Sequence, residues 1–169
     1  LREGWLPIFQ KYATNSEPSW EDFQERFGQY IPQPEPMPYT ELTPERLRLT
    51  LDRMNAADSV GADSWSVKEL RKLPDALLAR LCDLLHLIES TGKWPDSMAV
   101  GLITPVPKED AGLRAQNMRP ITVMSVVYRT WAATRMTEVT QWQETWLSSN
   151  VASYRPNMGC HDLWWTQAL

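Results

Sequence analysis

Two short β-compatible runs interrupt a sequence that is otherwise patterned for helices, and they limit the fold classes open to the chain. The first run, Met98–Pro107, is closed by two prolines, and the second, Arg119–Met124, is rich in β-branched residues. Because proline has no backbone N–H group to donate, these prolines suit a strand end or an edge strand. A polar stretch, Lys108–Asn117, joins the two runs. The pattern predicts one small antiparallel hairpin in a mostly helical α+β protein.

The N-terminal residues are patterned as two short amphipathic helices followed by an extended connector. Apolar residues recur at helical spacing in Trp5–Phe9 and Trp20–Phe27, and the hydroxyl of Ser19 is placed to cap the second helix. Alternate prolines in 31–38 fix the backbone and remove donors, which excludes a helix or a central strand there. We expect this connector to span a surface, and a ligand for a proline-reading domain is the alternative.

Helical patterns account for most of the remaining chain. Thr43–Glu45 combines a capping hydroxyl, a proline and a carboxylate, which is typical of a helix start. Further helices are expected at 67–70, at 125–142 and, after a loop-like tail, at 162–169. The strongest helical pattern starts at Pro74 and stops at Gly92, and its apolar residues predict the spine of the core. They are Leu77, Leu81, Leu84, Leu85 and Ile88.

Composition favours a single soluble domain inside the cell, in the cytoplasm or nucleus. The chain has 169 residues, 43% of them hydrophobic, and no apolar run long enough to span a membrane. The N-terminus lacks the plan of a signal peptide. Cys82 and Cys160 form no spaced framework, which favours reduced thiols. Most tryptophans, including Trp5, Trp20, Trp131 and Trp142, are expected in the core.

The charge distribution argues against a general-purpose nucleic-acid binder, whose affinity would come from neutralising phosphates with basic residues. The net charge is −4. Residues 93–135 nevertheless carry six basic and three acidic side chains, a net charge of +3. This block contains both predicted strands, and the alternative is ordinary fluctuation of charge along the chain.

Two cations flank the polar stretch of the predicted hairpin. Lys108 follows the first strand and Arg119 begins the second, so we expect them to face each other across the hairpin. Two cations in that position either repel each other or share an anion. Arginine offers a planar fork and lysine a compact charge, a combination suited to holding a polyphosphate. Two solvated charges beside a loop are the alternative.

The hairpin segment resembles the first two fingers motifs of reverse transcriptases of the non-LTR (LINE-type) retrotransposon family. Leu102–Lys108 matches an apolar strand ending in Pro-Lys, and Asn117–Thr122 matches Asn-x-Arg-Pro-Ile-Ser. Other landmarks stand in the family's order between residues 40 and 165. They are Ser59–Asp63 for Gly-Pro-Asp, Gly92–Pro95 for Gly-x-x-Pro, Tyr128-Arg129 for Tyr-Lys, and Tyr154–Gly159 for Gly-Phe-Arg-Pro-Gly-Arg. Ala62, Tyr154, Asn157 and Met158 depart from the family's residues.

The resemblance implies part of a right-hand polymerase, with a helical extension at 1–38 and a reverse transcriptase N-terminal and fingers region at 39–169. In the full-length enzyme, Lys108 and Arg119 would hold the triphosphate of a deoxynucleotide, and RNA template and primer DNA would be partners. Gly61 and Asp63 would shape a loop near the template, and Asn117 would brace the turn that presents Arg119. A tight turn with Asp63 capping the next helix is the alternative for that loop.

The carboxylates that the family uses for two-metal phosphoryl transfer are not recognisable in this sequence. They are a strand aspartate and a Tyr-x-Asp-Asp turn, and no Asp-Asp pair occurs here. We therefore expect a fragment that is truncated before the palm domain, has no catalytic residue of its own and does not polymerise alone. Mg²⁺ is expected only in the full-length enzyme.

Three other interpretations remain open. A non-enzymatic helical interaction module could be built on the 74–90 helix, and it would be favoured if Lys108 and Arg119 lay on different faces. The fingers region of a group II intron-type reverse transcriptase would fit the same motifs. A zinc site could combine the chain's four Cys and His residues, although adjacent ligands rarely converge on one ion. These residues are Cys82, His86, Cys160 and His161.

Overall fold

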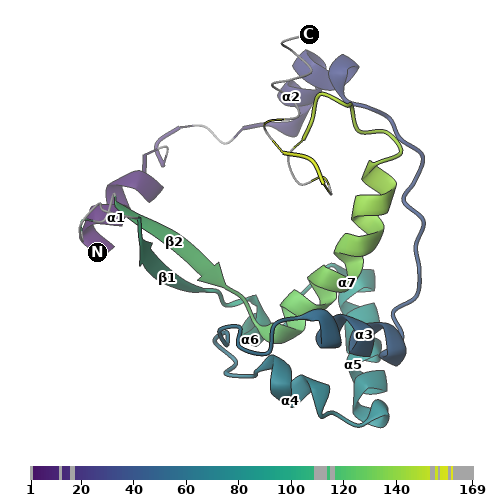
Figure 1. Ribbon diagram of the computed structural model, residues 1–169. Coiled ribbons are helices and arrows are strands. Elements are labelled where there is room, and N and C mark those ends of the chain that lie inside the picture. Colours follow the sequence, from purple (N-terminus) through teal and green to yellow (C-terminus); the bar gives the residue numbers. More distant parts are fainter. Residues whose placement is uncertain are drawn as a thin grey trace.

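The computed structural model confirms an α+β protein in which one β-hairpin extends from a helical body (Figure 1). It describes residues 2–11, 13–15, 18–108, 114, 117–152, 155, 157–159 and 161. The body consists of four helices: α3 (Pro44–Arg53), α4 (Val67–Arg71), α5 (Asp75–Thr91) and α7 (Val126–Gln143). The helix expected at 162–169 lies outside the described residues. No helix in the described part of the chain is both long enough and apolar enough to cross a membrane.

The core forms where α3, α5 and α7 bury their apolar faces against one another. Leu47, Leu51, Leu78, Leu85 and Val126 have no exposed surface at all. Fully burying such a side chain is worth about 1.5–3 kcal/mol, so these contacts dominate the stability of the body. The core therefore sets the position of α7. The second strand of the hairpin leads directly into this helix.

Local capping signals decide where the helices begin and end. The hydroxyls of Ser19, Thr43 and Ser66 each accept a backbone N–H bond in the first turn of the following helix. Gly92 ends α5 with φ +67°, a conformation that glycine adopts without the cost other residues incur. These boundaries confirm the predicted helix starts and the predicted stop.

The face of α5 that points into the core differs by one position from the prediction. Leu77 was expected in the apolar stripe, but it is 51% exposed, and Leu78 and Cys82 are buried in its place. Six leucines and one isoleucine in α5 offer two overlapping stripes, so the sequence pattern alone does not single out the buried one. Packing against α3 and α7 decides it.

The first predicted strand begins later than expected because a short helix precedes it. Residues Asp96–Ala99 form α6 after Pro95, and β1 covers only Leu102–Pro107. The second strand, β2, runs from Met118 to Val123. The two strands pair antiparallel and form the one sheet found in the described residues.

The N-terminal arm consists of α1 (Arg2–Phe9), α2 (Trp20–Phe27) and the 3₁₀ turn η1 (Gly28–Tyr30), followed by the extended connector. None of the residues of α2 is buried, and Trp20 is 61% exposed, so its predicted place in the core is wrong. The indole N–H of Trp142 in α7 donates to the carbonyl of Glu35 at 2.7 Å, which ties the connector to the body.

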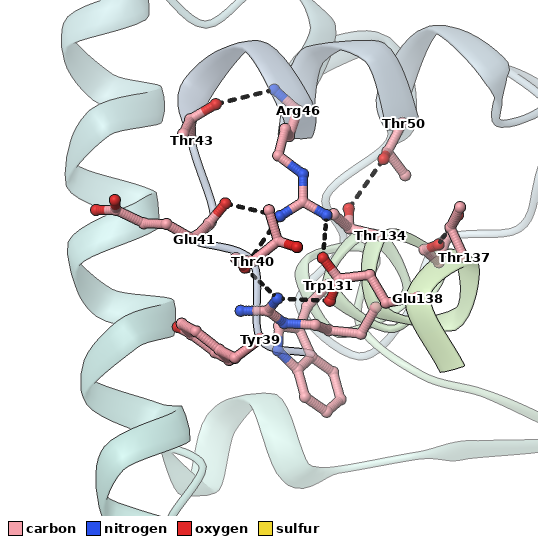
Figure 2. A network of polar contacts seen from close by, with 12 residues as sticks. Tyr39, Thr40, Glu41, Thr43, Arg46, Thr50, Trp131, Thr134, Thr137 and Glu138 are labelled. Carbon is pink, nitrogen blue, oxygen red and sulfur yellow. Dashed lines mark hydrogen bonds and ion pairs between the residues drawn. The ribbon is translucent and has the colours of Figure 1, made fainter. Parts of the chain in front are cut away.

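A buried ionic network joins the end of the connector to α3, α5 and α7. Figure 2 shows its contacts among the connector, α3 and α7. Arg135, only 7% exposed, makes two hydrogen bonds with Glu89 and one with Glu138. Glu138 also pairs with Arg46, and the carbonyl of Thr40 accepts from Arg46 and Arg135. Burial alone would raise the pKa values of Glu89 and Glu138, but the bonds from the arginines outweigh it and lower both. The charges are therefore compensated, as buried charges must be.

Candidate functional site

The tip of the hairpin carries both cations that the sequence singled out, but with a different register from the expected one. Arg119 pairs across the sheet with Val106, and the backbone N–H of Lys108 donates to the carbonyl of Asn117 at 2.9 Å. The expectation that Lys108 and Arg119 sit directly opposite each other is therefore wrong by two residues. The cause is that the ladder extends one residue pair beyond the strands, so Asn117 faces Lys108.

The corrected register still puts the two cations on one face of the hairpin. Side chains alternate along a strand, so Lys108 points to the same face as Val106, and Arg119 shares that face as the cross-strand partner of Val106. Diagonal neighbours of this kind have Cα atoms about 7–8 Å apart. Both residues are exposed. Their long side chains can therefore reach a common anion, with less mutual repulsion than in a directly opposed pair.

The strand sequences explain why the hairpin forms and stays a two-stranded unit. Ile103, Val106 and Ile121 are β-branched, which suits the pleated backbone. Pro105 lies opposite Pro120, and neither can donate to a further strand. The backbone N–H of Asn117 donates to the carbonyl of Arg114 at 2.9 Å and closes the ladder on the loop side.

The loop that contains Gly61 and Asp63 packs at the opposite end of the hairpin, where β2 leads into α7. A Cβ atom on Gly61 would lie 2.7 Å from the carbonyl oxygen of Met124 and 2.8 Å from the Cα of Ser125. Only glycine fits this approach without a shift of the backbone. The Arg129 guanidinium donates to the carbonyl of Ser59 at 2.6 Å, which fixes the same loop from α7.

Asp63 shapes the loop without capping the next helix. Its carboxylate accepts the backbone N–H of Trp65 at 3.4 Å, which is the pattern of an Asx turn. The cap of α4 is Ser66, which forms a reciprocal capping box with Glu69. The alternative in which Asp63 caps that helix is therefore not what the structure shows, although the tight turn is present.

The structure thus separates the predicted site residues into two groups. Lys108, Asn117 and Arg119 lie at the tip of the hairpin, and Gly61 and Asp63 lie at its root. Arg119 lies in β2 and Met124 directly follows this strand, so the two are five residues apart. This separation corresponds to roughly 16 Å at about 3.3 Å per residue of strand. One small ligand does not touch both groups, whereas an extended polymer could.

Sequence reasoning noted Tyr128 and Arg129 as a pair but missed what each contacts. The Tyr128 ring packs within 5.0 Å of the Trp94 ring and 5.7 Å of the Trp131 ring, between ring centres. This aromatic cluster joins the first turn of α7, which follows β2, to Trp94, which precedes α6 and β1. The Trp131 indole N–H donates to Glu89, which links the cluster to the ionic network. Helical spacing put Trp131 on the inner face, but no local signal names its partners.

The described residues contain no group of three or more His, Cys, Asp or Glu side chains that could hold a metal ion. Cys82 is a free, buried cysteine, and burial raises the pKa of its thiol. Cys160, the third residue of the zinc alternative, lies outside the described residues.

Comparison with known proteins points to a mobile genetic element. No protein-family model matches the chain. Over 127 residues the chain is 28% identical to the "Retrovirus-related Pol polyprotein from type-2 retrotransposable element R2DM" of Drosophila melanogaster. The match covers 73% of this chain but only 11% of that polyprotein. The similarity supports a retrotransposon-related origin.

Proposed function

We propose that this chain is the fingers region and N-terminal extension of an RNA-directed DNA polymerase of a retroelement, and that the tip of its hairpin binds the triphosphate of the incoming deoxynucleotide. The observation that carries the proposal is the register of β1 and β2, which puts Lys108 and Arg119 on one exposed face. The similarity to a retrotransposon Pol polyprotein supports the same assignment. RNA template, primer DNA and a palm domain are the proposed partners.

The two cations have complementary tasks in this proposal. The Arg119 guanidinium can hold two phosphate oxygens at once through its planar fork, and the Lys108 ammonium adds a compact charge that follows the phosphate as it moves. Such donors stabilise charge that develops on a transferring phosphoryl group. The hairpin supplies these contacts from a two-stranded frame in which Pro105 and Pro120 offer no N–H group to a further strand.

Binding of a deoxynucleoside triphosphate, or of tripolyphosphate alone, to this chain tests the proposal. We expect Lys108→Ala and Arg119→Ala each to weaken binding about 10-fold, in line with the loss of one charge-assisted hydrogen-bonding group. Arg80→Ala is the matched control, because Arg80 is an exposed cation on α5, remote in sequence from the hairpin. Isothermal titration at low salt would measure all three.

Equal affinities for the wild-type chain and both hairpin variants would refute the proposal. In a polymerase that contains the palm domain, Arg119→Ala should raise KM for the nucleotide or lower kcat and leave the fold intact. Unchanged nucleotide kinetics in that polymerase would also exclude binding of the triphosphate by Arg119.

A non-enzymatic interaction module is the second candidate. The observation that favours it is the outer face of α5, where Leu77 and Leu87 are more than half exposed. If the chain binds no polyphosphate but Leu77→Ser and Leu87→Ser abolish its binding to another protein, this second candidate replaces the first.

A further inference from the structure

An apolar cavity of about 340 Å³ lies beside the loop at the root of the hairpin. Leu70 and Leu81 from α4 and α5, Met98 from α6 and Val127 from α7 form most of its wall. Its mouth is polar and aromatic, with Asp63, Trp65 and Ser97. The volume lies at the lower end of the range for small-ligand sites, about 300–1,000 Å³. An apolar wall with a few polar groups is the usual composition of such sites.

The backbone of the loop is shaped to present Trp65 at this mouth. Ser64 has φ +58°, a conformation that residues other than glycine seldom adopt. Its N–H donates to the carbonyl of Gly61 at 3.1 Å, and Gly61 is fixed against Met124 and Ser125. Trp65 nevertheless keeps 46% of its surface exposed. A strained turn that holds a large aromatic ring in water is better explained by a ligand than by packing.

We propose that this cavity binds one unpaired nucleobase of a single strand. The base stacks on the Trp65 ring, and its amino group donates a hydrogen bond to the Asp63 carboxylate. This inference rests on the proposed function, because a polymerase fragment meets single-stranded template. Stacking on an aromatic side chain holds a base whatever its identity. The Asp63 carboxylate then selects among the bases, because it can only accept hydrogen bonds and so favours a base that donates one.

The Asp63 carboxylate has acceptor capacity for this role. One of its oxygens accepts the N–H of Trp65 at 3.4 Å, and a carboxylate offers about four acceptor positions in all. Adenine, cytosine and guanine each present an amino group as donor. Uracil and thymine present carbonyl oxygens beside a single N–H group, and these oxygens would face the carboxylate unfavourably. Bases that carry an amino group are therefore preferred.

The helix that follows the loop carries two exposed cations. Lys68 and Lys72 lie one turn apart on α4 and at its end, and both are exposed. Residues at i and i+4 share one side of a helix, so the two ammonium groups form a short basic row directly after Trp65 in the chain.

Fluorescence anisotropy of end-labelled hexanucleotides tests the proposal on the complete chain. We expect the adenine and cytosine homopolymers to bind more tightly than the uracil homopolymer. Trp65→Ala should weaken binding of the adenine strand at least fivefold, and Trp65→Phe should retain most of it, because phenylalanine keeps a stacking face. Trp20→Ala is the matched control, since Trp20 is an exposed tryptophan on α2. Asp63→Asn should remove the discrimination against uracil while leaving stacking in place.

The proposal is overturned if Trp65→Ala and Trp20→Ala bind alike, or if the three homopolymers bind equally to the wild-type chain. Matched ribose and deoxyribose strands identify the natural source of the base, because the chemistry described is common to both. The variants Lys108→Ala and Arg119→Ala separate this inference from the proposed function. Loss of triphosphate binding in those variants, with no dependence of oligonucleotide binding on Trp65, refutes only the nucleobase cavity.

Discussion

At the scale of single residues, Gly61 has the most demanding position in the described chain that bears on the candidate site. It lies where the 58–63 loop touches the backbone between β2 and α7, with Met124 and Ser125 closer than any side chain would permit. The loop could be recognised from sequence as a turn. The sequence did not indicate that the turn needs a glycine. The reason for the glycine is the approach of the Met124 backbone, which lies more than sixty residues away in the chain.

Gly61→Ala should destabilise the protein by about 1–3 kcal/mol, because the added methyl group overlaps backbone atoms that cannot rotate away. Gly28→Ala is the control. At Gly28 an added Cβ would lie 3.4 Å from the Gln24 side chain, and the backbone has φ −54°, which alanine adopts readily. Urea denaturation of both variants measures the difference. A Gly61→Ala midpoint equal to that of Gly28→Ala would contradict the close packing.

At the scale of elements, the hairpin combines exposed apolar residues with edges that resist further pairing. Leu102, Ile103, Val106 and Ile121 are all more than 40% exposed. Exposed strand edges next to such residues are templates for aggregation. Pro105 and Pro120 face each other in the middle of the hairpin and have no N–H groups to offer. The prolines therefore leave the hairpin's edges without two of the donors that a further strand would need.

Replacing both prolines by threonine should promote self-association through the strand edges. The double variant Pro105→Thr/Pro120→Thr restores two backbone donors and adds residues of high β propensity. We expect concentration-dependent growth of light scattering that the wild-type chain does not show under the same conditions. Replacing Pro36 and Pro38 in the connector is the control, because those prolines lie in no strand. Scattering that rises equally in both double variants would mean that the hairpin edges are not the cause.

At the scale of the whole molecule, the network around Arg135 joins segments that are far apart in sequence. Arg135 contacts Glu89, 46 residues away, and Thr40, 95 residues away. Arg46 contacts Glu138 across 92 residues. The network therefore fixes α3, α5, α7 and the end of the connector in one arrangement. Through Trp131 it also reaches the aromatic cluster of Trp94, Tyr128 and Trp131.

This network should make stability fall in acid. The folded-state pKa values of Glu89 and Glu138 are lowered from the ordinary value of 4.5. Their contribution is therefore fully present above pH 4.5 and is lost as the pH falls through the folded-state values. We expect the urea midpoint of Glu89→Gln/Glu138→Gln to be lower than that of the wild type at pH 7 and to change less between pH 7 and pH 3. Glu144→Gln, which removes an exposed ion pair with Arg155, is the control.

A Glu89→Gln/Glu138→Gln variant that keeps the full acid dependence would show that other carboxylates carry the effect. The Glu144→Gln control should keep the change in midpoint between pH 7 and pH 3 that the wild type shows.

The sequence by itself determined the features that depend on neighbouring residues. Capping hydroxyls at Ser19 and Thr43, the stop at Gly92 and the run of prolines in 31–38 act within a few residues, so their consequences could be predicted and are confirmed. The presence of a hairpin between two β-branched runs is of the same kind. Each of these features forms or excludes hydrogen bonds within its own turn, strand or helix end.

Only the tertiary structure decided which surfaces meet. It placed Arg119 opposite Val106, chose the buried side of α5, left Trp20 in water and brought Trp65 to the mouth of a cavity. A helix with two apolar stripes, or a hairpin with several registers, has alternatives that are nearly equal locally. Packing against distant segments selects one of these arrangements, because that arrangement removes far more apolar surface from water than the others do.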